Sequence, residues 1–306
     1  MKYLIGMDGG GTKTKCVLTD INLSPIYETT GGPSNFLVIG TETVSTTIFK
    51  LIDECISSQK IVVDEISAIV LGTTGGGRRN DAETLENQIL KDAEIKKIPI
   101  HKIRIESDAR IALEGAFSGK AGSILIAGTG SIMFGKDAAG QIHRVGGFGR
   151  FVGDEGSGYR IGRIGLNAVA RDLDGRGKPT KISDLLSQEF SISSPENLIT
   201  EVYRNNFNIA SVAPLVFKAA ENGDKIAQRI LEDEADELIL HITTMKTKLK
   251  VPVLRVSLIG SLLTKANYFS YLFNEKVVRN FKDVQIMEAE HSPEFGAALM
   301  AKQCNW

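Results

Sequence analysis

The sequence is poor in cysteine and has no large excess of charge of either sign. Its three cysteines, Cys16, Cys55 and Cys304, are far apart and form no C-x-x-C pair. An odd and scattered set favours reduced thiols over a disulfide framework or a zinc knuckle. The formal net charge is −1, so no basic field indicates binding to nucleic acid or to an anionic membrane.

Long apolar runs and a leader sequence are also missing. No apolar run approaches the ~20 residues that a membrane-spanning helix needs. The chain opens on a predicted strand, without a charged-then-apolar leader, so we expect a cytoplasmic protein. Its 306 residues are enough for two domains of ordinary size, and its 31 glycines are unusual because they cluster.

The first glycine cluster lies in the opening stretch. Residues 4–18 read as an apolar strand, a glycine turn that begins with Asp8, and a second strand. Glycine has no Cβ, so the N–H groups of such a turn can approach a phosphate closely. Asp8 would repel a bare phosphate, and a Mg²⁺ ion between them would relieve the repulsion. The pattern predicts Asp8 as the metal-organising acid of a nucleotide hairpin formed by Gly9, Gly10, Gly11, Thr12, Lys13 and Thr14.

Two other phosphate-binding motifs resemble this turn but differ from it in sequence. A Walker A loop needs a lysine where Thr12 stands and a helix after the turn. The dinucleotide-binding fingerprint also needs a following helix, whereas residues 13–20 alternate like a strand. An ordinary hairpin with a flexible turn stays open on the motif alone.

The rest of the chain repeats the opening pattern. In the first part, strands at 25–29, 66–71 and 102–106 alternate with helices at 42–57, 81–91 and 110–117, which argues a mixed sheet with helices on its faces. A strand at 123–127, the turn Gly128–Ser131 and strands at 132–134 and 141–145 then reproduce the first hairpin. A glycine-rich loop at 146–158 comes next, then a mostly helical stretch at 180–249 with breaks predicted near Ser194-Pro195 and Pro214. Strands at 252–259 and 284–287 and a last helix after Ser292 follow. The repeat predicts two amide nests that face one polyphosphate.

Four strings carry a family resemblance: Met7–Thr14, Ser107–Ala109, Ala127–Ser131 and Gly146–Gly158. They resemble the N-acetylglucosamine kinase family, which is grouped with the BadF/BadG/BcrA/BcrD ATPases in the superfamily of actin, sugar kinases and heat-shock ATPases. The strings follow the family's order over nearly the whole chain. The resemblance implies an α/β fold of two RNase H-like (actin-like ATPase) domains, each a mixed five-stranded sheet with flanking helices, around a central nucleotide and sugar cleft. The expected domains are 1–117 with 291–306, and 118–290.

The resemblance implies an ATP-dependent kinase that phosphorylates an amino sugar at O6. N-acetylglucosamine or a close relative, such as N-acetylmuramic acid or glucosamine, is the expected substrate, with Mg-ATP between the two hairpins. The family's catalytic base maps onto Asp108, although a helix N-cap is the alternative role of that residue. Gly128 and Thr129 map onto the second phosphate turn. Gly260 and Ser261 resemble the adenosine-side loop, where a plain strand-to-helix turn is the alternative.

The family's sugar-binding pattern maps onto Asn35, Thr74, Gly75, Asp108, Gly130, Ser131, Gly147, Phe148 and Asp154. Asn35 has a turn residue, and Asp154 a helix cap, as the alternative role. Phe148 stands where the family often has tryptophan, which puts the identity of the sugar in doubt. Arg78 and Arg79 follow the loop of Thr74 and read as solvated residues, yet arginines beside an amino-sugar pocket would favour the lactyl carboxylate of N-acetylmuramic acid.

Two other functions compete with a kinase. A BadF-type ATPase would drive a partner protein, as do activators of radical dehydratases, but those hold an iron–sulfur cluster with cysteines and no matching pair is apparent here. A non-catalytic sugar sensor would need a degraded base or hairpin, and both read as intact. Zinc and Glu-x-Gly-His motifs of ROK-type glucokinases are missing. A homodimer is compatible with the resemblance, and no partner beyond the small-molecule amino sugar is expected.

Overall fold

The computed structural model describes residues 2–303, so Cys304 lies outside the described residues. The chain divides into two compact units. The first holds the residues up to 122, residues 138–140 and the residues from 288 on, and the second holds 123–137 and 141–287. Each unit contains a mixed five-stranded sheet with helices against it, which confirms the expected fold class.

The first sheet has the strand order β3-β2-β1-β4-β5. Its strands are β1 (Tyr3–Gly9), β2 (Thr14–Asp20), β3 (Pro25–Gly31), β4 (Ile66–Thr73) and β5 (Ile103–Glu106). The first three form an antiparallel meander, and β4 and β5 continue the sheet in parallel with β1. The carboxyl ends of β1, β4 and β5 therefore share one edge of this sheet, where ligands bind in open α/β sheets.

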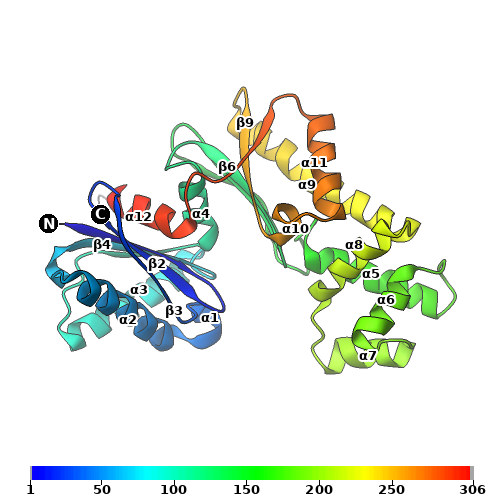
Figure 1. Ribbon diagram of the computed structural model, residues 1–306, viewed down its shortest axis with the longest axis horizontal. Coiled ribbons are helices and arrows are strands. Elements are labelled where there is room, and N and C mark those ends of the chain that lie inside the picture. The colour runs from blue at the N-terminus through cyan, green and yellow to red at the C-terminus, as the bar shows by residue number, and fades with distance from the viewer. Residues whose placement is uncertain (1, 304–306) are drawn as a thin grey trace. The chain divides into compact units, whose positions relative to one another are not determined.

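Helices cover both faces of the first sheet (Figure 1). One face carries α2 (Thr41–Gln59) and α3 (Arg79–Lys96), and the other carries α4 (Asp108–Ala116) and α12 (Pro293–Gln303). Successive strand residues point to opposite faces. Ile5 and Met7 accordingly join the cluster under α2 and α3, whereas Leu4 joins the one under α4 and α12. The short α1 (Phe36–Ile39) and η1 (Val63–Glu65) complete this part.

The last helix, α12, approaches its neighbours backbone to backbone. A Cβ on Gly6 of β1 would lie 2.1 Å from the carbonyl oxygen of Glu294. A Cβ on Gly296 of α12 would lie 2.0 Å from the carbonyl oxygen of Ile111 in α4. These distances are far below van der Waals contact, so only glycine fits at either position. The helix α12 is thus a tightly fitted part of the first unit.

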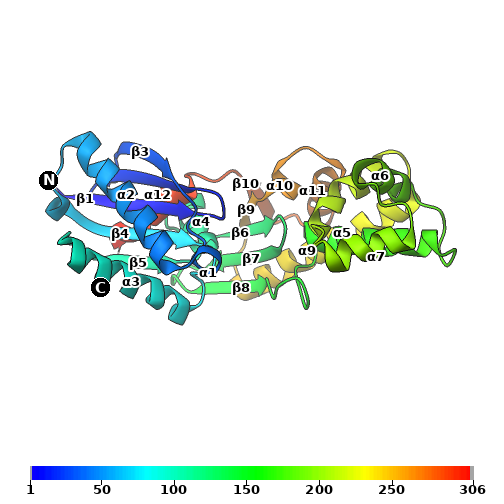
Figure 2. The same cartoon turned by 90° about the horizontal axis from the view of Figure 1, so that it is seen from below.

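The second sheet has the order β10-β9-β6-β7-β8. Its strands are β6 (Gly122–Ala127), β7 (Ser131–Lys136), β8 (Ile142–Gly146), β9 (Leu254–Ile259) and β10 (Val284–Met287). Figure 2 shows β6, β7 and β8 side by side. Read from β8, this order matches that of the first sheet. In the second sheet β7 and its antiparallel partner β8 lie on one side of β6, and the parallel strands β9 and β10 lie on the other. The predicted internal repeat is confirmed.

Helices make up most of the second unit. They are α5 (Gly158–Leu173), α6 (Lys181–Phe190), α7 (Pro195–Arg204), η2 (Ile209–Val212), α8 (Ala213–Glu221), α9 (Lys225–Leu249), α10 (Ser261–Thr264) and α11 (Tyr268–Asn280). Breaks occur at Ser194-Pro195 and near Pro214, as predicted, because proline fits the first turn of a helix. The break before α9 was not predicted, and Asp224 caps that helix by accepting the N–H groups of Ile226 and Ala227.

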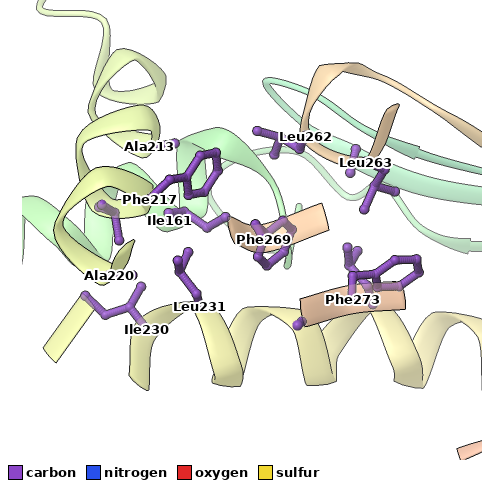
Figure 3. Packing of buried hydrophobic residues seen from close by; sticks show 14 of the residues in the cluster. Ile161, Ala213, Phe217, Ala220, Ile230, Leu231, Leu262, Leu263, Phe269 and Phe273 are labelled. Atoms are coloured by element: carbon purple, nitrogen blue, oxygen red, sulfur yellow. The ribbon is translucent and has the colours of Figure 1, made fainter. Parts of the chain in front are cut away.

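The core of the second unit is one large apolar cluster (Figure 3). Phe269 and Phe273 of α11 are fully buried and point toward α9, where Leu231 packs between the helices. The ring of Phe269 stacks on that of Phe217 from α8, with centroids 5.9 Å apart. This packing holds α9 in place, and α9 supports the glycine-rich loop described below.

Two cysteines lie in the core of the first unit. The Sγ atoms of Cys16 and Cys55 are 3.8 Å apart, and both thiols are free and buried. The hydrogen bond between them, together with burial, raises the pKa of Cys16 well above its usual range. No helix in the part of the chain that the structure describes is long and apolar enough to cross a membrane.

Candidate active site

Asp8 lies near the end of β1, at the ligand-binding edge of the first sheet. No described residue donates a hydrogen bond to its carboxylate. Burial, followed by the negative charges of Glu294 and Asp108, raises the pKa of Asp8 to about 6, and Lys15 opposes the shift. A carboxylate of this kind would be stabilised by a cation. No group of three or more His, Cys, Asp or Glu among residues 2–303 is arranged to hold a metal, so an ion here would take water and phosphate oxygens as further ligands, which suits Mg²⁺.

The turn after β1 exposes its backbone. Gly10 donates its N–H to the carbonyl of Lys13 at 3.0 Å, which closes the turn. Gly11, Thr12 and Lys13 are exposed at its tip, and a Cβ on Gly11 would meet nothing. The exposed amides of this tip are available to a phosphate.

Thr14 does not fit the expected role of a direct phosphate donor. Its side chain is fully buried, and its hydroxyl donates to the carbonyl oxygen of Gly32 at 2.7 Å. A hydroxyl has one proton to donate, so Thr14 ties the hairpin to the loop after β3 instead. The sequence pattern could not predict this hydrogen bond, because Gly32 is 18 positions away and comes close to Thr14 only in the folded protein.

The loop that carries Asn35 is fixed from two sides. The N–H of Ser34 donates to the carbonyl of Gly10 at 3.0 Å, and the hydroxyl of Thr73 donates to the carbonyl of Ser34 at 2.8 Å. Asn35 follows at the start of α1, and its Oδ1 is buried without a hydrogen-bond partner. A buried acceptor without a donor is uncommon, and a sugar hydroxyl would satisfy it.

Asp108 lies beside Thr74 at the edge of the first sheet. Ser107 caps α4 by accepting the N–H of Arg110 at 3.1 Å, so Asp108 is free of the capping role. Oδ1 of Asp108 accepts the N–H of Ala109 at 2.8 Å, and Oδ2 accepts the hydroxyl of Thr74 at 3.0 Å. Thr74 follows β4 and Asp108 nearly follows β5, so the parallel pairing of these strands brings the two together. The carboxylate is exposed and oriented, as a proton acceptor must be.

Gly75 follows Thr74 in a left-handed conformation, with a φ of +96°. A Cβ at this position would lie 2.7 Å from the Leu37 side chain of α1. The loop after β4 therefore packs against α1, and the structure brings Thr74, Gly75 and Asp108 into one neighbourhood with the helix that Asn35 begins.

The second glycine turn is anchored on α5. The N–H groups of Gly158 and Tyr159 donate to the carbonyls of Gly128 and Thr129 at 2.8 and 3.2 Å. Gly260 lies against the same turn, because a Cβ on it would be 2.2 Å from the carbonyl oxygen of Ala127. Since β6 and β9 are parallel neighbours, their ends bring Gly128 and the Gly260–Ser261 corner together. These residues were expected to bind phosphate and adenosine respectively.

Asp154 is held at the second turn by two backbone amides. It has a φ of +59° and accepts the N–H groups of Ser131 and Gly149. Ser157, not Asp154, caps α5. Burial raises the pKa of Asp154 in spite of these hydrogen bonds. Its side chain lies against Gly130, where a Cβ would be 2.9 Å from Oδ2.

Ser131 and Phe148 were both expected to contact the sugar, but they differ in how exposed they are in the structure. Ser131 is buried and its hydroxyl donates to the carbonyl of Glu155 at 2.5 Å, so its hydroxyl proton is committed to the loop. Phe148 is 71% exposed, with the Arg144 guanidinium 5.4 Å from its ring centroid. Gly147 precedes it with a φ of +70°, beside Ile132.

Sequence reasoning missed Glu234 of α9, which supports the loop that carries Asp154. Its buried carboxylate accepts the N–H of Gly156 at 2.7 Å and the Nε–H of Arg160 at 3.3 Å. Burial raises the pKa of Glu234, against the lowering effect of these two donors. No local sequence motif indicates this role, because Glu234 lies 78 positions after Gly156 in an ordinary amphipathic helix.

Replacing Glu234 by alanine is expected to destabilise the second unit by about 3–5 kcal/mol, because it leaves a buried N–H and a guanidinium without their acceptor. Glu234→Gln keeps an acceptor for Gly156 and should cost about 1–3 kcal/mol. Urea denaturation measures both values. Glu232→Ala, on the exposed side of the same helix, is the matched control and should stay within about 0.5 kcal/mol of the parent. Equal effects of Glu234→Ala and Glu232→Ala would contradict the role assigned to Glu234.

The chain is similar to several sugar kinases over nearly its full length. An N-acetylmuramic acid/N-acetylglucosamine kinase of Clostridium acetobutylicum is 33% identical over 307 residues, with 99% of each chain covered. An N-acetyl-D-glucosamine kinase of Dictyostelium discoideum is 30% identical over 318 residues, with 98% of each covered. The crystal structure of a candidate N-acetylglucosamine kinase from Chromobacterium violaceum has a TM-score of 0.75 at 23% identity, with 99% of both chains covered, and shows the same fold.

The family comparison includes the residues of both glycine turns. The model of the BadF/BadG/BcrA/BcrD ATPase family matches residues 5–301. That range contains both five-stranded sheets, apart from the first two residues of β1, and the helix α12 almost to its end. The chain therefore belongs to the BadF/BadG/BcrA/BcrD ATPase family.

Proposed function

We propose that this protein is an ATP-dependent amino-sugar kinase. The observation that carries the proposal is the placement of Asp108, an exposed carboxylate oriented by Thr74 and the Ala109 amide at the ligand-binding edge of the first sheet. The relatives named as kinases, which the chain matches over 85 to 99% of their length, act on N-acetylmuramic acid, N-acetylglucosamine or glucosamine, and this supports an amino sugar as the acceptor.

Asp108 would act as the general base. One carboxylate oxygen accepts the proton of the attacking hydroxyl while the hydroxyl oxygen forms a bond to the γ-phosphorus and the bond between the γ-phosphorus and the ADP oxygen breaks. Both carboxylate oxygens already accept a hydrogen bond, and each has a second lone pair available. These bonds fix the orientation of the carboxylate before the substrate arrives, which lowers the entropic part of the barrier.

Mg²⁺ would be held near Asp8, in part through water. When bound, it neutralises the charge on the phosphate oxygens. The exposed amides of Gly11 and Thr12 in the first unit and that of Thr129 in the second would bind phosphate oxygens, with Lys13 adding charge. The N–H groups of Gly10 and Gly128 close these turns by donating to the carbonyls of Lys13 and Gly130. The corner at Gly260 and Ser261 would contact the adenosine.

The sugar would be bound through its hydroxyl groups. Asn35 offers a buried acceptor without a partner, and Asp154 offers a carboxylate suited to a vicinal hydroxyl pair. Gly130 and Gly147 would allow a close approach, and the exposed Phe148 ring would pack on an apolar part of the sugar. The 6-hydroxyl is the proposed site of phosphorylation.

A coupled assay of ADP release over a panel of amino sugars, with ATP and Mg²⁺, tests the proposal. Sugar-stimulated ADP release and a sugar phosphate in the mass spectrum are expected, and a 6-deoxy sugar should bind without turnover. ADP release that no sugar stimulates would overturn the kinase proposal. It would favour instead an ATPase that drives a partner protein.

A further inference from the structure

The second unit contains a cavity of about 720 Å³ beside its glycine turn. Thr129, Gly130 and Asp154 line one side, and side chains between Val202 and Ile209 line another. Arg150 and Tyr159 also line it. The volume is sufficient for a sugar-sized ligand. The cavity thus joins residues proposed to bind the substrate to an arginine that has no assigned role.

Arg150 is the arginine of this region that has no partner for its charge. Arg144 donates to the carbonyls of Gly146 and Gly147, and Arg160 pairs with the buried Glu234. No hydrogen bond or ion pair of Arg150 occurs within residues 2–303. Two of the three arginines around the glycine-rich loop therefore serve the fold, and the third is available to a ligand.

Two aromatic rings lie beside the Arg150 guanidinium. Its Cζ lies 5.0 Å from the ring centroid of Phe151 and 5.8 Å from that of Tyr159. Such cation–π contacts attract the guanidinium without using its N–H donors. A planar fork of this kind suits a carboxylate, which it can bind through two parallel hydrogen bonds.

The charge of Asp154 selects among anions. This carboxylate lines the same cavity, so a dianionic phosphate would meet more repulsion there than a singly charged carboxylate. The Asp154 carboxylate can accept hydrogen bonds from hydroxyl groups. The cavity therefore offers an acceptor for hydroxyls together with a cation for a carboxylate, which matches a sugar acid.

We propose that Arg150 determines substrate specificity by binding the carboxylate of an acidic amino sugar, such as the lactyl carboxylate of N-acetylmuramic acid. This inference rests on the proposed kinase function. It replaces Arg78 and Arg79 as the favoured carboxylate ligands. Arg79 is paired with Glu83 and Glu86, and the Arg78 side chain is 86% exposed with its Nη1 3.9 Å from Asp81.

The test compares kcat/KM for N-acetylmuramic acid and N-acetylglucosamine in the parent protein and in Arg150→Ala. We expect a loss of about 10- to 100-fold for the acidic sugar and a change of less than about threefold for the neutral one. Arg150→Lys should recover only part of the loss, because an ammonium cannot form the paired hydrogen bonds. Arg163→Ala, an exposed arginine of α5, is the matched control and should leave both sugars unaffected.

Four results would overturn the inference. Equal losses for both sugars would assign Arg150 a general role, and a raised KM for ATP alone would assign it to phosphate. A parent protein that phosphorylates N-acetylglucosamine but not the acidic sugar would remove the inference and leave the kinase function standing. A selective loss in Arg78→Ala but not in Arg150→Ala would return the role to Arg78.

If Arg150→Ala unfolds at a lower temperature than the parent, the affinities of Arg150→Lys for the two sugars, measured by calorimetry, replace the kinetic comparison. Equal losses of affinity for both sugars would then overturn the inference. A parent protein that phosphorylates neither sugar would instead refute the proposed function.

Discussion

Asp108→Asn is expected to bind ATP like the parent protein but to turn over amino sugars about 10²- to 10⁴-fold more slowly, the usual cost of removing a general base. The amide keeps the size of the side chain, and its oxygen can still accept the Ala109 N–H, whereas its NH2 group can only donate, to the hydroxyl oxygen of Thr74. It cannot take the proton of the attacking hydroxyl. Steady-state kcat and a fluorescent-nucleotide titration measure the two properties separately.

Two variants sharpen this test. Asp184→Asn removes an acid from the first turn of α6, as Asp108→Asn does from the first turn of α4, so both should lose a similar helix-dipole contribution of about 0.3–1 kcal/mol. Only the change at Asp108 should affect turnover. Thr74→Val removes one orienting hydrogen bond and should lower kcat by about 10-fold, less than the loss of the base itself. Parent-like turnover in Asp108→Asn would refute the assignment.

Asp8→Asn is expected to weaken Mg²⁺ binding and lower kcat/KM for Mg-ATP by about 10²-fold, while it raises the stability of the metal-free protein. The pKa of Asp8 is raised to about 6, so the folded state binds more protons than the unfolded state between pH 4 and 6. This group therefore makes stability fall as the pH rises through that range. At pH 8 the neutral asparagine should stabilise by about 1–2 kcal/mol, after allowance for partial solvent exposure.

The same shift predicts the pH dependence of the metal. A proton competes with Mg²⁺ at Asp8 below pH 6, so the apparent Kd should rise by about tenfold per pH unit there and level off above pH 7. Titration of the ADP-bound protein with Mn²⁺, followed by its paramagnetic signal, measures this without any turnover. Asp53→Asn, an exposed acid of α2, is the control. A Kd that is flat from pH 5 to 8 would contradict the assignment of Asp8.

Local patterns were enough to predict much of the fold. Alternating apolar strands and glycine turns revealed the hairpins at Gly9–Thr14 and Gly128–Ser131, and their repetition revealed the two matching sheets. The N-cap of α4 was harder to assign, because Ser107 and Asp108 are adjacent and both residue types cap helices well. Only the structure shows that Ser107 caps and that Asp108 is free.

Side-chain partners that are distant in sequence set the limit of prediction. Thr14 and Ser131 have the right residue type for phosphate or sugar binding, but each donates its proton to a carbonyl within its own unit. Glu234 shows the converse, a site-supporting residue in a stretch with no motif. The break before α9 was missed because its cap, Asp224, follows a single glycine within an otherwise helical pattern.

The fit of α12 against Gly6 and Ile111 has a consequence for how this protein is made. While the ribosome is still translating the second unit, only α4 covers this face of the first sheet, so part of the apolar surface around Leu4 and Val70 stays open to water. Domains often complete their folding in the order of their synthesis. Here the first unit must wait for α12, which is synthesised after the second unit, and chaperones would have access to the incompletely covered face until then.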